Sequence, residues 1–413
     1  MNAKTMFGVG VGLVGCVGCV LTAPLFAADK YTFNPKQIRH GIVIADTTGK
    51  WAYHWPRVMP AQWGSEIVIH CTKNAWGGDG VKPGGHERVP DKPGAISGLQ
   101  LRSTDNGETW KEEGGFRDRV TGPVKLPIDF KNPNFCARYN TRGTHYISYD
   151  RAKTWLTWKA WEGLGGELKS NFHLKNEGKT AVIVTDQRHL SKFRHNCRTL
   201  LTTDQGRTWS LGGEWKGTFT SHQLLDLNGA LHPKYPKGRG DYPVAIGPYT
   251  VRLGEDELLG VGRSRFGGVL HRSMDFGKSW KLEGVVHPEA QTSWVESWLV
   301  VLGGQYPANP NPKYVIAVWG ARARMAGTDS EGNDLRAGPR ARLSKDGGRT
   351  WSKNVVQLRN DMQDGDHGFD SGEPVAYERT DGKIIMIYWW QTNKRPQPHI
   401  AYTVFDPNIE GKE

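Results

Sequence analysis

The chain has 413 residues, with 54 Lys and Arg against 42 Asp and Glu, so its formal net charge is +12 at pH 7. It contains 52 Gly and 17 Trp. The aromatic content argues against a disordered chain, and the absence of a three-residue Gly period excludes collagen. A single long apolar run excludes a membrane protein with several spans. What remains is a folded protein long enough to bury a sizeable core.

The first 28 residues are typical of a secretory signal peptide. One lysine, Lys4, precedes an apolar stretch at residues 6–21, and two alanines, Ala27 and Ala28, close the segment. We therefore predict that the protein is exported to the periplasm or the medium. Residues 29–413 are predicted to form one domain. Lipid anchoring at Cys16 is an alternative to soluble export.

Three cysteines remain after removal of this segment: Cys71, Cys136 and Cys197. Three thiols allow at most one disulfide, so the chain is not a disulfide-stabilised scaffold. A Cys136–Cys197 bridge and three buried thiols are both compatible with the sequence. The absence of a Cys-x-x-Cys pair argues against a structural zinc site.

An eight-residue motif occurs five times and explains part of the Gly and Trp content. Each copy has a hydroxyl residue first, Asp third, a second hydroxyl residue seventh and Trp last. The fifth residue is Gly except in the second copy, which has Ala152. The five aspartates are Asp105, Asp150, Asp204, Asp275 and Asp346.

The motif has the chemistry of a tight hairpin turn. Its Asp carboxylate can accept hydrogen bonds from backbone N–H groups, its Gly permits positive φ, and its Trp can pack into a core. Strand patterns at residues 95–102 and 269–272 precede two of the copies. Each repeat is therefore predicted to be a small antiparallel sheet that needs neighbouring repeats to cover its faces.

The pattern Ser/Thr-x-Asp-x-Gly-x-Thr/Ser-Trp resembles the Asp-box, or BNR repeat, of the sialidase superfamily. The resemblance implies an all-β, six-bladed β-propeller of four-stranded antiparallel sheets, with the motif aspartates in structural turns away from the central site. The 385 residues after Ala28 give about 64 residues per blade, which suits such a fold. Residues 374–390 and 399–405 form a last unit without the motif, and we expect its final strand to pair with the N-terminal segment.

The resemblance also implies three arginines that bind a substrate carboxylate at the mouth of the central channel, because a guanidinium holds a carboxylate in a two-pronged fork. Arg57 lies in a Trp-Pro-Arg-Val-Met-Pro segment similar to the family's opening motif. Arg263, ten residues before the fourth motif, is the second candidate. Arg322 is the third, and Arg324 and Arg340 compete with it.

The catalytic acid or base of the resembling family would lie in the Gly-rich loop at residues 74–87. Asp79 is our candidate there, with Glu87 and Asp91 as the next choices. The family's tyrosine nucleophile would align with Phe369, which cannot attack an anomeric carbon.

Other carboxylates are therefore needed near the expected nucleophile. Gly247 and Pro248 stand where the family's activating glutamate would precede Arg263. Asp370 and Glu373, close to Phe369, become candidate catalytic residues, as do Asp366 and His367. Glu296 is a further candidate, and its alternative role is to bind a neighbouring arginine.

We interpret the sequence as an exported, exo-acting glycoside hydrolase of the sialidase superfamily that removes a terminal acidic, sialic acid-like sugar. The positive net charge favours an anionic carbohydrate partner. We expect no cofactor, no metal, no nucleic-acid partner, no membrane span after signal removal, and a monomer.

Two alternatives stay open. One is a propeller polysaccharide lyase that acts on uronic-acid polymers, with His54, His70 or His367 as its base. The other is a non-catalytic glycan-binding propeller, which would need neither a nucleophile nor its activating glutamate. Four tryptophans could stack on a sugar, although packing in the core is the alternative for each: Trp55, Trp76, Trp389 and Trp390.

Overall fold

A computed structural model describes most of the chain beyond its first 30 residues. The described residues are 31–56, 61–76, 94–139, 144–159, 167–168, 170–186, 197–215, 246–264, 267–287, 296–321, 327–328, 334–360, 372–392 and 395–409. They belong to one compact unit, Tyr31–Glu413. The expected signal peptide at residues 1–28 lies outside the described residues. Within these ranges, no helix has the length and apolar character needed to cross a membrane.

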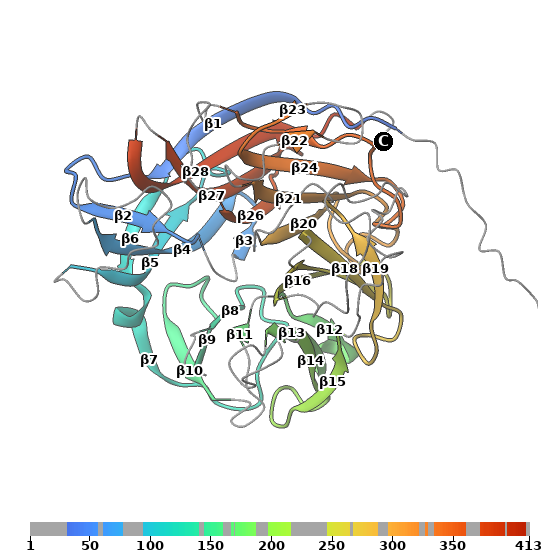
Figure 1. The fold of residues 1–413 in the computed structure, drawn as a ribbon. Coiled ribbons are helices and arrows are strands. Elements are labelled where there is room, and N and C mark those ends of the chain that lie inside the picture. Colours follow the sequence, from blue (N-terminus) through green and yellow to red (C-terminus); the bar gives the residue numbers. More distant parts are fainter. Residues whose placement is uncertain are drawn as a thin grey trace, which may run out of the picture. The chain divides into compact units, whose positions relative to one another are not determined.

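Six β-sheets form a six-bladed propeller, which confirms the predicted all-β fold (Figure 1). Blade 1 contains β2 (Trp51–His54), β3 (Ala61–Trp63), β4 (Glu66–Ala75), β5 (Ile96–Ser103) and β6 (Lys111–Gly115). Blade 2 contains β7 (Val120–Pro123), β8 (Cys136–Tyr139), β9 (His145–Ser148) and β10 (Trp155–Trp158). Blade 3 contains β11 (Glu167–Leu168), β12 (His173–Lys175), β13 (Thr180–Asp186), β14 (Cys197–Thr202) and β15 (Ser210–Glu214).

The second half of the ring is built in the same way. Blade 4 contains β16 (Ile246–Arg252), β17 (Leu258–Ser264), β18 (Gly267–Ser273) and β19 (Lys281–Val285). Blade 5 contains β20 (Ser297–Val301), β21 (Val315–Ala321), β24 (Gly338–Ser344) and β25 (Val356–Gln357), with a separate hairpin of β22 (Gly327–Thr328) and β23 (Asp334–Leu335). Blade 6 contains β26 (Gly372–Glu378), β27 (Ile384–Thr392), β28 (Arg395–Asp406) and β1 (Lys36–Ile44). Two short 3-10 helices, η1 (Phe116–Arg119) and η2 (Asn176–Gly178), lie between strands.

Blade 2 departs from the predicted antiparallel pattern. Its outer strand β7 pairs in parallel with β10, although the other pairings of this blade are antiparallel. β7 comes before the rest of the blade in the chain, so the chain forms this outer edge first and then crosses to β8 at the opposite edge of the sheet. The four-stranded plan is therefore kept with one parallel pair.

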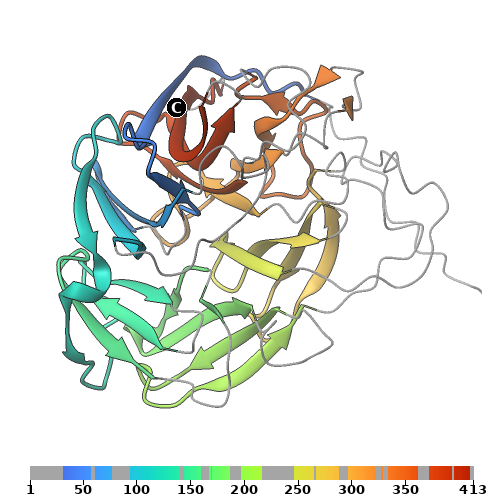
Figure 2. The same cartoon turned by 60° about the vertical axis from the view of Figure 1, so that its left-hand side comes forward.

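The ring closes by pairing the first described strand with the last, as the sequence predicts. β1 runs antiparallel to β28, with Lys36 opposite Asp406 and Ile42 opposite Ala401. In Figure 1 and in the turned view of Figure 2, the blue strand lies beside the red strands of blade 6. Strands from both ends of the described chain thus share one sheet.

The five Asp motifs have the same hydrogen bonds in every copy. In the third, Thr202 Oγ1 donates to Asp204 Oδ1 at 2.7 Å, and the backbone N–H and hydroxyl of Thr208 donate to the two carboxylate oxygens at 2.9 and 2.6 Å. The Thr208 bonds hold the pKa of Asp204 at about 2, well below its usual value. The other four copies repeat these contacts, so all five aspartates are engaged within their own turns.

The fifth position of the motif explains why Gly is common there. Gly348 has φ +82°, and a Cβ on it would lie 2.5 Å from Leu259 in β17 of the preceding blade. Ala152, the exception, also has positive φ and is buried between blades 1 and 2, where its carbonyl accepts a hydrogen bond from Gln100. The motif turns of blades 2 and 5 therefore pack directly against the blade before them.

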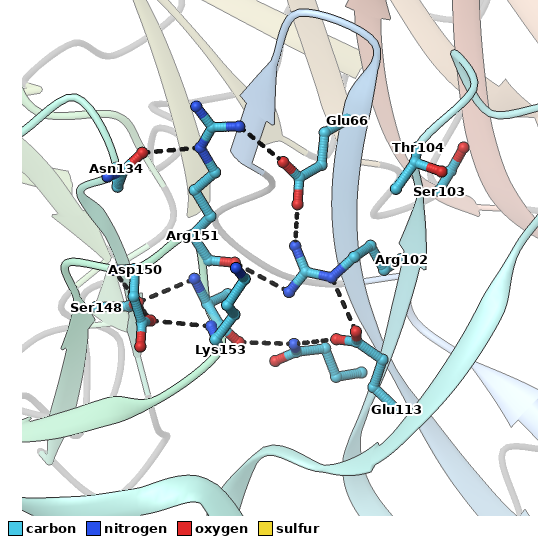
Figure 3. A network of polar contacts seen from close by, with 12 residues as sticks. Glu66, Arg102, Ser103, Thr104, Glu113, Asn134, Ser148, Asp150, Arg151 and Lys153 are labelled. Atoms are coloured by element: carbon cyan, nitrogen blue, oxygen red, sulfur yellow. Dashed lines mark hydrogen bonds and ion pairs between the residues drawn. The ribbon is translucent and has the colours of Figure 1, made fainter.

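Buried arginines strengthen two of these contacts between blades. Arg102 of β5 donates to Glu113 at 2.8 Å, to Glu66, and to the carbonyl of Arg151 in the blade 2 motif at 2.9 Å (Figure 3). Arg151 in turn donates to Glu66 at 3.0 Å. One carboxylate is thus shared by arginines of two blades, and we call this cluster the blade 1–2 ion cluster.

Blades 4 and 5 contain an equivalent arrangement, the blade 4–5 ion cluster. Arg272 donates to Glu283 at 2.7 Å, to Glu257 at 2.5 Å and to the carbonyl of Gly347 at 3.0 Å. Arg349 donates to Glu257 at 2.9 Å. Arg151 is the fourth residue of its motif and Arg349 the sixth, and each donates to a glutamate of the preceding blade, so a similar contact is built twice around the ring.

The three cysteines are all buried thiols. Of the two possibilities that the sequence left open, the structure therefore has thiols rather than a Cys136–Cys197 bridge. Burial raises the pKa of Cys136 to about 12, which keeps this thiol protonated at neutral pH.

Candidate functional site

The strands of blades 4, 5 and 6 bring their ends together at one mouth of the propeller. Ile246, which starts β16, lies opposite Arg263 near the end of β17. Ser297, which starts β20, lies opposite Trp319 in β21, and Gly372, which starts β26, lies opposite Trp389 in β27. β20 contacts both β16 and β26. We call this end, where the three inner strands begin, the Arg263 mouth.

Arg263 lies between two glutamates at this mouth. Its Nη1 atom is 3.6 Å from Glu296 Oε1 and 3.9 Å from Glu373 Oε1. The three side chains are only 10%, 16% and 11% exposed, in that order. They come from β17, from the residue before β20, and from β26, so three blades each contribute one charged group. The structure therefore brings together Arg263 and Glu373, both predicted from the sequence, with Glu296.

Gly247 provides the space for Glu296. A Cβ at position 247 would lie 2.9 Å from Glu296 Oε1, closer than a carbon and an oxygen normally approach, and the residue has φ +65°. Glu373 is itself in the left-handed region, with φ 49°, which is unusual for a residue with a side chain. Such strained backbone is found preferentially at functional sites. The resemblance would place the activating glutamate near position 247, where this sequence has Gly. The carboxylate of Glu296, from the next blade, packs against this Gly247.

Four predicted site residues lie outside the described residues: Arg57, Asp79, Arg322 and Asp370. The same holds for Phe369, Asp366, His367, Arg324, Glu87 and Asp91. The described strands next to them end or begin close by in the chain, since β4 ends at Ala75, β21 at Ala321, and β26 begins at Gly372. The roles given to these residues therefore stay predictions.

Aromatic residues pack on the inner strands. Tyr249 of β16 stacks on Trp298 of β20, with ring centroids 3.5 Å apart, and its hydroxyl accepts a hydrogen bond from Asn171 Nδ2 at 2.7 Å. Burial raises the pKa of Tyr249 and of Tyr377 above the usual value for tyrosine. A raised pKa disfavours the phenolate, so neither tyrosine is activated to replace the nucleophile that is missing at Phe369.

Two residues that the sequence offered as site candidates, Arg340 and His70, are packed within the fold. Arg340 is fully buried, and its Nη2 donates to the carbonyl of Arg336 at 2.6 Å. His70 is buried, contacts Gln100 at 2.8 Å and packs against Phe116 and Trp155, and burial lowers its pKa. Both side chains are thus unsuited to contact a substrate at the mouth.

The four candidate tryptophans divide into two pairs. Trp389 and Trp390 are buried in the core, at 2% and 0% exposure, and so cannot stack on a sugar. Trp55 and Trp76 are half-buried and keep this possibility. Trp55 has φ 51° and its ring lies 5.5 Å from that of His54, which also contacts the ring of Trp389.

No cluster of three or more metal-ligating side chains occurs within the described part of the chain. Among the groups that the structure places at the Arg263 mouth, two carboxylates and one guanidinium carry the charge. Such a set can hold a polar ligand, transfer protons and stabilise developing positive charge.

Of the solved structures that are similar to this chain, the first one below supports the fold alone. A protein of unknown function from Dyadobacter fermentans is 16% identical with a TM-score of 0.53, and the match covers 89% of this chain and 99% of that one. An α-L-arabinofuranosidase from Fusarium graminearum is 13% identical with a TM-score of 0.48, over 86% and 97% of the two chains. The α-L-arabinanase of Penicillium chrysogenum is 12% identical with a TM-score of 0.47, over 89% and 99%. No family model and no curated protein matches the chain.

Proposed function

We propose that the chain is a glycoside hydrolase with its active site at the Arg263 mouth. The observation that carries the proposal is the pair of carboxylates, Glu296 and Glu373, on either side of Arg263. Because one oxygen of each is within 4 Å of the same nitrogen, these two oxygens are within about 8 Å of each other. In most glycoside hydrolases one carboxylate acts as nucleophile or base, and a second carboxyl group about 5 to 9.5 Å away acts as the acid.

The carboxylate pair also answers the problem raised by Phe369. A hydrolase that lacks a tyrosine nucleophile can use a carboxylate either as nucleophile or as the base that activates water. We assign this role to Glu373 or Glu296, and the donation of a proton to the leaving oxygen to Asp79, with Asp370 as the alternative acid. Arg263 holds the two glutamates in place and is near the charge that develops on the sugar.

For the substrate, we propose a terminal acidic sugar such as sialic acid, removed by an exo-acting and exported monomeric enzyme. The net charge of +12 favours an anionic glycan, and the motif resemblance implies an arginine clamp of Arg57, Arg263 and Arg322. Since Arg263 already faces two carboxylates, Arg57 and Arg322 would supply most of the positive charge felt by the substrate.

The decisive experiment compares three kinds of substrate with the purified protein. A fluorogenic sialoside tests the acidic sugar, a fluorogenic arabinofuranoside tests a neutral one, and uronic-acid polymers test a lyase through the ultraviolet absorbance of an unsaturated product. We expect fluorophore release from the sialoside, lost in Glu373→Gln and Asp79→Ala, and weakened mainly through KM in Arg57→Ala. The control Glu112→Gln changes a half-exposed carboxylate on β6 and should behave as the wild type.

Each outcome has a distinct meaning. Release from the arabinofuranoside alone keeps the hydrolase and rejects the acidic substrate. An unsaturated product replaces the hydrolase by a lyase. Glycan binding without any turnover, or turnover that survives both Glu296→Gln and Glu373→Gln, contradicts the proposed site.

A further inference from the structure

A cavity of about 420 Å³ lies at the end of β16 that is opposite to the Arg263 mouth. β16 runs from Ile246, beside Arg263, to Arg252, and Arg252 lines the cavity. The other walls come from β3, from the residues around β12, and from Gln305 and Tyr306 beyond the end of β20. Its volume is within the range of about 300–1,000 Å³ that is usual for small-molecule sites.

Aromatic rings form much of the cavity wall. Trp63, Phe135, Phe172 and Tyr306 line it, and each of these residues is half-buried. Phe135 and Phe172 contact each other edge to face, with centroids 5.8 Å apart. Aromatic rings that line a cavity offer flat apolar faces to a ligand.

Three amide side chains supply polar groups between these rings, and each is fixed by one end. Gln62 Nε2 donates to the carbonyl of Glu378 at 2.7 Å, Asn171 Nδ2 donates to Tyr249 at 2.7 Å, and Gln305 Oε1 accepts from the Arg252 N–H at 2.7 Å. In the described part of the chain, no protein group bonds the opposite ends, Gln62 Oε1, Asn171 Oδ1 and Gln305 Nε2. Two acceptors and one donor therefore remain for water or a ligand.

The cavity carries no available charge. The guanidinium of Arg252 donates to the carbonyls of Leu174, Gly254 and Glu255 at 2.6, 3.0 and 2.6 Å, and it also stacks over the ring of Tyr306. No Asp, Glu or Lys is among the described residues that line the space. Burial lowers the pKa of His173 to about 3, so this side chain is neutral.

We propose that this cavity is a second carbohydrate site that binds an uncharged saccharide unit. Aromatic faces suit the apolar C–H faces of a sugar ring, and preorganised amides suit its hydroxyl groups, which both donate and accept hydrogen bonds. A charged sugar would find no opposite charge to replace the water that it loses. The proposal is independent of the catalytic one, since it shares no residue with the Arg263 mouth.

The test is calorimetric titration of the full chain with galactose, arabinose, xylose and lactose, with glucuronic acid and N-acetylneuraminic acid as charged comparisons. We expect at least one neutral sugar to bind with simple saturation. Tyr306→Ala should weaken that binding by at least about tenfold, because it removes one wall of the cavity. Tyr306→Phe is the matched control, since it keeps the ring and loses only the hydroxyl that bonds Glu255.

Arg263→Ala separates the two sites, because it alters the Arg263 mouth and should leave the neutral sugar's affinity unchanged. The proposal is overturned if no neutral sugar binds the wild type. It is equally overturned if binding survives Tyr306→Ala, or if Arg263→Ala rather than Tyr306→Ala abolishes it. Circular dichroism and thermal unfolding of Tyr306→Ala show whether a loss reflects the cavity or misfolding, and Gln305→Glu, which adds a charge to the same wall, provides a second variant expected to lose binding.

Discussion

Gly247 and Glu296 approach each other from blades 4 and 5, and their contact decides how the carboxylate meets Arg263. A methyl group at position 247 would occupy the space of Glu296 Oε1, 2.9 Å away. The glutamate would then have to move by several tenths of an ångström or more. A small displacement of this kind matters at a catalytic site, because reacting groups tolerate little misplacement.

We therefore predict that Gly247→Ala lowers kcat/KM by about 10- to 100-fold on whichever glycoside is hydrolysed. The positive φ of 65° adds a backbone cost of about 1–2 kcal/mol for a residue with a side chain. Gly64→Ala is the matched control, because Gly64 has φ +60° with nothing within 4 Å of an added Cβ. Equal losses of stability with loss of activity only in Gly247→Ala would support the assignment, whereas full activity of Gly247→Ala would contradict it.

His271 of β18 is a second residue whose surroundings lead to a measurable effect. It is fully buried, stacks on Trp215 with centroids 4.6 Å apart, and neither ring nitrogen has a partner among the described residues. Burial lowers its pKa to about 3, so the folded chain excludes a proton that the unfolded chain accepts near pH 6.5. Its neutral form thus stabilises the fold above pH 6.5 relative to lower pH.

We predict that His271→Phe has near wild-type stability at pH 7 and is more stable than the wild type at pH 4. The free energy of unfolding of the wild type should fall by up to about 1.4 kcal/mol more per pH unit between pH 6 and 4 than that of the variant. Urea denaturation at several pH values measures this difference. Parallel pH profiles for the two proteins would show that His271 does not carry the effect.

At the scale of the element, the motif turns and the ion clusters determine how one blade meets the next. Arg272 donates to two carboxylates and a backbone carbonyl, and its side chain is 5% exposed. Removal of Arg272 takes the cation away from Glu283 and leaves Glu257 with the more exposed Arg349 as its cation. The same reasoning applies to Arg102 in the blade 1–2 ion cluster.

We predict that Arg272→Met and Arg102→Met each cost about 3–5 kcal/mol of stability, as expected when one member of a buried ion pair is removed. Arg198→Met is the control, because Arg198 pairs with Glu214 inside one blade and is 32% exposed, so its loss should cost at most about 1 kcal/mol. Chemical denaturation gives the three values. Similar costs for all three variants would mean that the clusters between blades have no special weight.

The sequence predicts the repeating elements well because each Asp motif is a local structure. Hydroxyl, Asp, Gly and Trp lie within eight residues, and their mutual hydrogen bonds need no distant partner, so the turns can be recognised without the fold. The parallel strand β7 could not be predicted in this way, since its partner β10 is separated from it by two other strands. A local pattern carries no information about which edge of a sheet a strand will join.

At the scale of the whole molecule, the site is even harder to predict from local sequence patterns than the strand pairing is. Arg263 and Glu373 were identified one at a time, but their meeting with Glu296 depends on how three blades are placed around the ring. The residues of the second cavity come from even more separate segments, and none has a distinctive motif. Arrangements of this kind follow from the closed ring and not from spacing along the chain.

A charged contact also joins blade 6 to blade 1. Arg39 of β1 and Arg379, which follows β26, both bind Glu108 in the motif turn of blade 1. The bonds from Arg39 are the main cause that lowers the pKa of Glu108 to about 2, from an ordinary value near 4.5. The ionised carboxylate therefore stabilises the junction of blades 6 and 1 fully above pH 4.5, and this contribution is lost as the pH falls toward 2.

We predict that Glu108→Gln destabilises the protein at pH 7 and that its difference from the wild type shrinks between pH 4.5 and pH 2. The difference should also shrink in high salt, because the Glu108 side chain is 36% exposed. Glu112→Gln, which alters a carboxylate 4.0 Å from Lys73 within blade 1, is the control and should change little at any pH. A constant difference across the pH range would argue against the closing role.

The pairing of β1 with β28 has a consequence for the order in which the molecule can assemble. During synthesis β1 is made first among the described strands, whereas β28, its only neighbour in blade 6, is made last. The other five sheets draw their strands from successive segments and can form earlier. A nascent or truncated chain that stops before β28 therefore leaves β1 and β27 with unpaired edges, which are templates for aggregation. The pairing of β28, a strand of twelve residues, is therefore the final assembly step, and the closed ring depends on it.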